Sequence, residues 1–238
     1  MIRTMWLPLA VLFTVSAGCA GRPSPPAAQQ APRPAAAPAD ALTVGRIPIS
    51  DEPPAALVQL GQSAADLFDA AGASDWGRAL ASLQAMNDAR SNVPADLPDP
   101  GIAAKLEARM VSVRDATNNR HQLETMEAAN SITQLVAELS RKYRSEVPYE
   151  VRMLGYYGRQ IELGVASGNS TVSERATTDL VTTWDQIEPE IQRRGHIDEA
   201  RFNTIVVTLV SAKQAADLSG PARDELAAAR HLESIFSQ

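Results

Sequence analysis

Apolar residues recur every three or four positions from Leu57 almost to the C-terminus, and this spacing is typical of amphipathic helices. The β-branched stretch from Ile205 to Val210 has helix-favouring flanks, so it is predicted as a buried helical turn rather than a strand. The breaks between apolar stripes are short, and successive helices are therefore expected to run antiparallel. The sequence predicts an all-α antiparallel bundle of seven to eight helices over residues 55–238.

Start and stop signals divide this bundle into helices. Asp99-Pro100 has the form of an N-cap followed by proline in the first turn, and Pro148 separates two further stripes. Near Asn118-Asn119 the stripe either kinks or breaks, which leaves the helix count at seven or eight. Gly220-Pro221 is predicted to open the last helix. The predicted core positions include Leu57, Leu60, Leu67, Leu80, Leu83, Met86, Leu123, Met126, Leu154, Ile161, Trp184, Phe202, Leu209, Leu226 and Leu232.

The chain contains a weak internal echo. Residues 54–71 align without gaps with residues 148–165, matching the first proline and the pairs Leu60-Gly61 and Leu154-Gly155. Each half continues with further helical stripes, as in a tandem duplication of a four-helix unit. Chance similarity in an alanine-rich chain explains the match equally well at this stage.

The first eighteen residues are typical of a secretory signal. Arg3 precedes an apolar run from Met5 to Val15, which is too short for the roughly 20 residues that a membrane-spanning helix needs. The small residues Ser16-Ala17-Gly18 stand directly before Cys19, the only cysteine. We therefore predict a signal peptide over residues 1–18, and a plain cleaved signal that leaves a free thiol is the alternative.

The segment Ser16-Ala17-Gly18-Cys19 resembles the lipobox of bacterial lipoproteins, with Ser16 at the position that is usually aliphatic. The resemblance implies cleavage before Cys19, a diacylglyceryl thioether on its sulfur, an acylated amino group with a chain such as palmitate, and attachment to the membrane. Ala20 follows the cysteine where an aspartate would indicate inner-membrane retention, so the resemblance implies an outer-membrane lipoprotein that faces the periplasm.

A proline- and alanine-rich segment follows over residues 19–54. Residues 21–54 carry nine of the chain's 16 prolines. Proline fixes φ and lacks a backbone donor, so the segment favours extended coil. We interpret it as a disordered tether between the lipid anchor and the helical domain.

Charge and motifs exclude several classes of function. The chain has 22 Lys and Arg against 28 Asp and Glu, a net charge of −6, which disfavours binding to nucleic acid. Its motifs include no HExxH sequence, no GxSxG sequence and no phosphate-binding glycine loop. The sequence therefore predicts a non-enzymatic protein without a cofactor.

His121, Glu124 and Glu127 are spaced for adjacent turns of one helix, where an imidazole and two carboxylates could bind a transition metal. His121-Gln122-Leu123-Glu124 resembles the HxxE element of the imelysin family, whose helical-bundle members are linked to iron or peptide handling. The alternative is a solvated helix face.

A second candidate set comprises Asn130, Tyr156, Arg159 and Glu162. Asn130 lies on an apolar stripe, where a polar side chain needs a partner. Tyr156, Arg159 and Glu162 fall roughly on one helix face and could orient an anionic or metal-bound ligand. The alternative is a salt bridge beside tyrosines that cap the core.

The sequence thus favours a membrane-anchored periplasmic lipoprotein with a helical binding or scaffolding domain. Its partner would be an envelope protein or a small ligand. The alternative function is a metal- or cofactor-binding bundle that handles iron or copper in the envelope.

Overall fold

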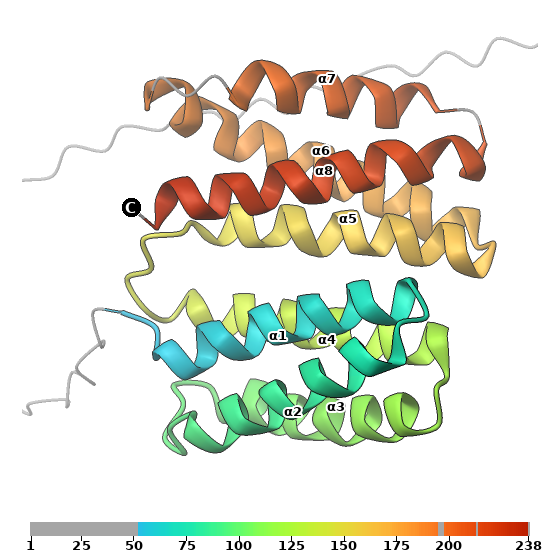
Figure 1. The fold of residues 1–238 in the computed structure, drawn as a ribbon. Coiled ribbons are helices and arrows are strands. Elements are labelled where there is room, and N and C mark those ends of the chain that lie inside the picture. The colour runs from blue at the N-terminus through green and yellow to red at the C-terminus, as the bar shows by residue number, and fades with distance from the viewer. Residues whose placement is uncertain (1–51, 195–197, 213, 238) are drawn as a thin grey trace, which may run out of the picture. The chain divides into compact units, whose positions relative to one another are not determined.

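The computed structural model describes residues 52–194, 198–212 and 214–237, which form eight α-helices and no strand (Figure 1). The helices are α1 (Ala55–Gly72), α2 (Trp76–Asn92), α3 (Pro100–Asn118), α4 (Gln122–Ser140), α5 (Tyr149–Ser167), α6 (Ser170–Arg193), α7 (Asp198–Ser211) and α8 (Ala215–Phe236). The predicted all-α bundle is confirmed. The predicted signal peptide, Cys19 and almost all of the tether lie outside the described residues.

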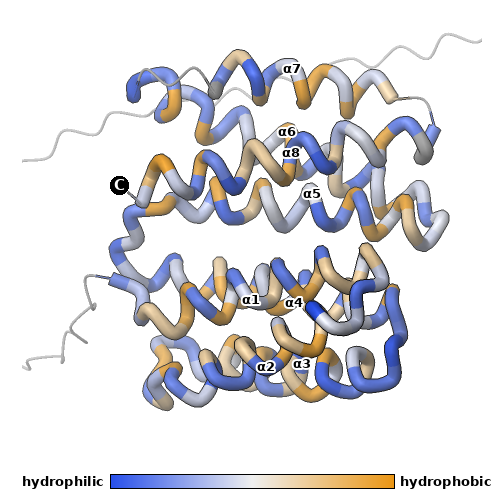
Figure 2. The backbone as a smooth tube through the Cα atoms, in the orientation of Figure 1, coloured by the Kyte–Doolittle hydropathy of each residue, from blue (hydrophilic) through white to orange (hydrophobic). Residues whose placement is uncertain are grey.

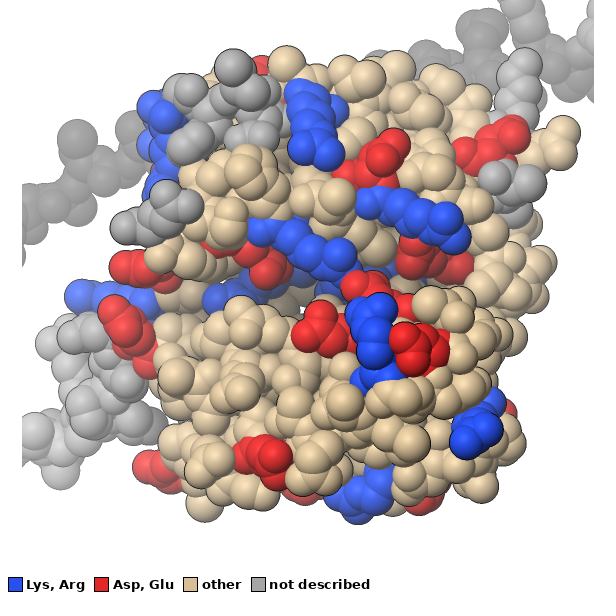
Figure 3. Space-filling model, in the orientation of Figure 1, with Lys and Arg blue, Asp and Glu red and all other residues tan. Residues whose placement is uncertain are grey.

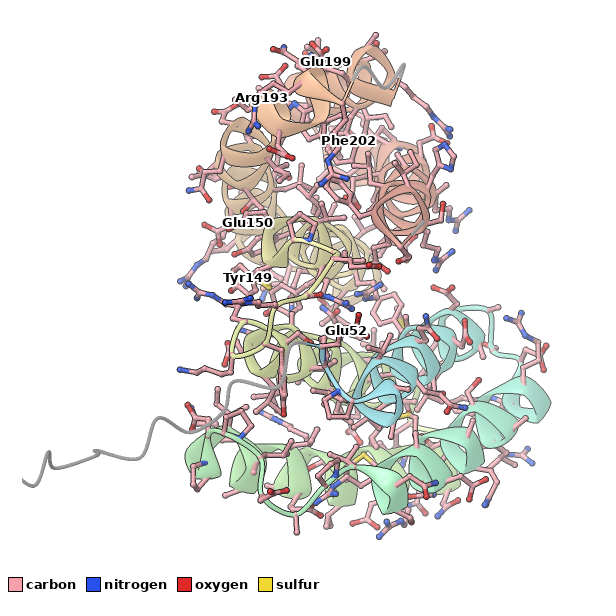
Figure 4. All side chains as sticks on the ribbon, turned by 90° about the vertical axis from the view of Figure 1, so that its left-hand side faces the viewer. Glu52, Tyr149, Glu150, Arg193, Glu199 and Phe202 are labelled. Carbon is pink, nitrogen blue, oxygen red and sulfur yellow. The ribbon has the colours of Figure 1, made fainter. Side chains whose placement is uncertain are left out.

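The helices build two hydrophobic cores, one among α1–α4 and one among α5–α8. We call these groups the N-terminal half and the C-terminal half. Figure 2 shows hydrophobic and hydrophilic residues alternating along the helices, as expected when each helix turns one face to a core. Figure 4 looks along the helices and shows Phe202 pointing into the C-terminal half, where its ring stacks on Trp184 at 4.2 Å between centroids.

Both halves have the same order of helix packing. In the N-terminal half α1 packs on α2 and α4, and α3 packs on α4; in the C-terminal half α5 packs on α6 and α8, and α7 packs on α8. The two halves meet through α4 and α5.

The sequence offset of the internal similarity between residues 54–71 and 148–165 recurs in the backbone. Helices α1 and α5 begin at Ala55 and Tyr149, and α2 and α6 begin at Trp76 and Ser170, so each pair is 94 residues apart. Ser74 (φ 57°) and Gly168 (φ 67°), also 94 residues apart, have left-handed backbone conformations in the two equivalent turns. These correspondences favour the tandem duplication.

The structure decides two helix boundaries, and the first of them sets the helix count at eight within the described residues. The stripe near Asn118-Asn119 breaks rather than kinks, because Arg120 turns the chain at φ 56° and α4 starts afresh at Gln122. The prediction that Gly220-Pro221 opens the last helix is wrong: α8 begins at Ala215 and Pro221 lies inside it. The carboxylate of Asp217 accepts a hydrogen bond from the backbone N–H of Gln214 at 3.2 Å, which caps the helix earlier.

Leu80 and Leu123 are 44% and 40% exposed, so their assignment to the core is wrong. Leu123 lies in the first turn of α4, where the neighbouring Gln122 faces α1 instead: its side-chain amide donates to the carbonyls of Ala71 and Gly72, both at 3.0 Å. None of the helices in the described ranges combines the length and apolar character needed to cross a membrane.

Candidate functional site: an arginine-lined cavity between the two halves

Two adjoining cavities lie where α1 and α4 face α5 and α8. The first has a volume of about 570 Å³ and the second about 640 Å³, both within the usual range for small-molecule sites. Leu226 and Arg230 line both cavities, so these two side chains stand between them. Figure 3 shows charged residues of both signs gathered along the boundary between the two halves, where the surface is hollowed.

Arg159 on α5 reaches the first cavity because its own helix has no side chain in the way. Gly155 lies one turn earlier, and both terminal nitrogens of the guanidinium lie 3.6 Å from the place where a Cβ of Gly155 would stand. The guanidinium thus lies over the glycine, and Arg159 is only 6% exposed while still lining the cavity.

Two uncharged side chains of α4 orient this guanidinium. Nε of Arg159 donates to Oδ1 of Asn130 at 2.9 Å, and Nη2 donates to Oγ1 of Thr133 at 3.2 Å. The amide of Asn130 is itself fixed, because its Nδ2 donates to the backbone carbonyl of Tyr156 at 3.2 Å and its Oδ1 accepts from Thr133 at 3.0 Å. Asn130, the buried polar residue on the apolar stripe, therefore has hydrogen-bond partners, and one of them is Arg159.

Arg159 has no carboxylate partner within ion-pair distance among the described residues, although it is almost fully buried. Burial lowers the pKa of Arg159, but a guanidinium keeps its charge at neutral pH. A buried charge without a counter-ion is costly, and an anion in the cavity would offset that cost.

Arginines outnumber carboxylates among the charged residues that line the first cavity. Arg152, Arg159 and Arg230 line it together with only two carboxylates, Asp66 and Glu233. Nε of Arg152 is buried and makes no hydrogen bond to any described residue. Burial raises the pKa of Glu233, against the opposing influence of Arg152 and Arg159. Three arginines therefore line this cavity against two carboxylates, and one of the three, Arg230, is paired with Asp69 outside the cavity lining.

The second cavity is more nearly balanced. Arg230 forms an ion pair with Asp69 of α1 at the boundary between the two cavities, and Arg223 approaches Glu162 at 3.6 Å. Desolvation raises the pKa of Glu162, and Asp69 adds to this shift. All four charged side chains that line this cavity therefore already have a partner of opposite charge.

Glu225 of α8 lies beside the site and is fully buried. Neither carboxylate oxygen makes a hydrogen bond to a described residue. A Cβ added to Gly158 of α5 would stand 1.8 Å from Oε2 of Glu225, so the carboxyl group occupies space that only glycine leaves open. Desolvation raises the pKa of Glu225 well above its usual range, although Arg159 opposes the shift.

The structure brings part of the second predicted set together. Asn130 is in direct contact with Arg159, which lines the first cavity, and Tyr156 joins them only through its backbone carbonyl. The hydroxyl of Tyr156 instead accepts a hydrogen bond from Gln160 at 3.1 Å. Glu162 lines the second cavity, so the predicted set divides between two adjoining spaces.

The metal candidates lie elsewhere. Nδ1 of His121 contacts Oε2 of Glu124 at 2.7 Å, and both side chains are more than half exposed. Glu127 lines the same small hollow. Within the part of the chain that the structure describes, no group of three or more His, Cys, Asp or Glu is arranged to hold a metal ion. Metal binding therefore stays a prediction without a preformed ligand cage.

Sequence reasoning missed Thr133, Arg152, Arg230, Glu225 and Glu233. Glu225 had a visible signal, because it interrupts an apolar stripe with three- and four-residue spacing. That stripe comprises Leu218, Ala222, Glu225, Ala229, Leu232 and Phe236. The arginines carried no such signal, since their meeting depends on how the two halves pack.

Comparison with known proteins found no matching family model, no similar curated protein and no similar solved structure.

Proposed function

We propose that this protein is a periplasm-facing outer-membrane lipoprotein whose helical domain binds a small anion, without catalysis, in the cavity between its two halves. The observation that carries the binding proposal is Arg159: buried, oriented by Asn130 and Thr133, and without a carboxylate partner among the described residues. Arginine presents a planar set of donors that matches carboxylate, sulfate and phosphate groups.

The site supports binding more than scaffolding. A purely structural interface would pair each buried arginine with a carboxylate, whereas the arginine that does form such a pair, Arg230 with Asp69, is half exposed. Arg152 and Arg159 both line the first cavity, and the volume of about 570 Å³ suits a small organic or inorganic anion.

Sulfate titration tests the binding proposal. We expect saturable sulfate binding by the full chain at constant ionic strength, and a loss of about tenfold or more in affinity for Arg159→Gln, because a charge-assisted hydrogen bond is removed. Isothermal titration calorimetry measures both affinities, and circular dichroism checks the fold. Arg175→Gln is the matched control, since it removes the same charge from a side chain that is 85% exposed on α6.

Equal affinities in the wild type and Arg159→Gln, or no saturable binding in the wild type, would contradict the anion site. If Arg159→Gln does not fold, Arg152→Gln replaces it, because Arg152 lines the same cavity and its Nε makes no hydrogen bond to a described residue.

The proposed location of the protein at the outer membrane depends on Cys19 and the lipobox resemblance. We expect the mature protein to begin at an acylated Cys19 and to partition into the outer-membrane fraction, because several acyl chains anchor a protein far more firmly than one. Mass spectrometry of the N-terminal peptide measures the modification. An unmodified Cys19 in mature protein would contradict the anchor, and Cys19→Ser should release the protein from the membrane.

A further inference from the structure

Glu225 is a buried carboxyl group at a position where the packing of the helices does not require a charged residue. Gly61 of α1 lies against Val136 of α4, and Gly155 of α5 lies against Ala229 of α8. Helices α4 and α8 therefore correspond with an offset of 93 residues, and α1 and α5 with an offset of 94. By these offsets Glu225 stands where the N-terminal half has Ile132, and Gly158 stands where it has Ala64.

The corresponding residues of the N-terminal half are both fully buried in its apolar core. An apolar pair at this position is therefore compatible with the fold, and the C-terminal half has a carboxyl group and a glycine instead. A fully buried carboxyl without a hydrogen-bonding partner is destabilising, and more so when it is ionised. Packing therefore does not explain why the C-terminal half has Glu225 and Gly158 in place of an apolar pair.

The surroundings of Glu225 connect it to the anion site. It adjoins Leu226, which lines both cavities, and it packs against Gly158, the residue next to Arg159. The charged groups that act on it are Arg159 and Glu162 from α5, and Arg230 and Glu233 from its own helix. Among these, Arg159 is the strongest opposite charge.

We propose that Glu225 is a proton-binding site coupled to the anion site, so that the cavity takes up its anion together with a proton on Glu225. This rests on the proposed anion site. With Glu225 protonated, the charge of Arg159 is available to the ligand. With Glu225 ionised, its negative charge offsets the positive charge of Arg159 and repels the anion. Linkage makes the effect reciprocal: a bound anion strengthens proton binding at Glu225.

The proton site is tested first without any anion. A carboxyl whose folded pKa is raised binds its proton more tightly in the folded state, so it costs stability once the pH exceeds the unfolded pKa. The cost grows up to the folded pKa. Glu225→Gln removes this titration. We expect the melting temperature of Glu225→Gln minus that of the wild type to increase between pH 5 and pH 10, by about 3 °C or more.

Glu174→Gln, an exposed glutamate on α6, is the matched control and should show no such increase. A difference between Glu225→Gln and the wild type that is constant over this range would overturn the proton site. If Glu225→Gln does not fold, Glu225→Ile introduces the residue that the N-terminal half has at this position, and the same comparison applies.

Coupling is tested with sulfate, whose charge is constant over this range. We expect wild-type affinity to fall as the pH rises, and Glu225→Gln to hold its affinity at least threefold better between pH 7 and pH 10. Glu162 and Glu233 titrate in both proteins, so the difference between the proteins isolates Glu225. Parallel pH profiles would overturn the coupling. Failure of the wild type to bind sulfate at any pH would instead overturn the anion site, and the coupling with it.

Discussion

The contact between Gly158 and Glu225 constrains residue 158 to glycine. A side chain at residue 158 would meet Oε2 of Glu225 at 1.8 Å and also Cδ2 of Leu226 at 2.9 Å. Both groups are buried, so neither can move into solvent. The glycine is therefore required for close approach of α5 and α8, and not for an unusual φ angle.

We expect Gly158→Ala to destabilise the protein by about 1–2 kcal/mol, because overpacking costs about 1–3 kcal/mol and the gain in helix propensity returns up to about 1 kcal/mol. Thermal unfolding measures the change. Gly77→Ala is the control: it lies in the exposed first turn of α2, where a Cβ has only an ordinary contact at 3.6 Å. It should be neutral or stabilising, and an equal loss of stability in both variants would contradict the packing argument.

At the scale of the elements, local signals in the sequence predicted some helix boundaries and missed others. Asp75 and Asp99 cap α2 and α3 through hydrogen bonds to the backbone N–H groups of Arg78 and Ile102, as their sequence positions indicate. The start of α8 was mispredicted because two signals compete there: Gly220-Pro221 is the stronger sequence signal, but Asp217 caps the helix first.

The site was less predictable than the helices, because its members come from distant parts of the chain. Asn130 and Arg159 stood out as polar residues beside apolar stripes, and they proved to be partners. Arg230 and Asp69 form an ion pair across 161 residues of sequence. Periodicity shows which face of a helix is apolar, but it does not show which helix from the other half faces it.

At the scale of the whole molecule, the repeated four-helix arrangement explains where a site can form. Each half buries its apolar stripes in its own core, so the surfaces that meet between the halves are free to carry polar groups. Two cavities lie at that junction, and one of them has more arginine than carboxylate. The tether and the lipid anchor at Cys19, both proposals from the sequence, would hold this domain close to the membrane surface.

Locating a bound anion is the most direct test of the claim that the cavity between the halves is an anion site. Selenate has the shape and charge of sulfate, and its anomalous scattering identifies it in crystals of the protein soaked with sodium selenate. We predict an anomalous peak in the first cavity within hydrogen-bond distance of the Arg159 guanidinium, and no such peak in Arg159→Gln crystals. Peaks confined to surface arginines such as Arg175, or a cavity without anomalous density in the wild type, would contradict it.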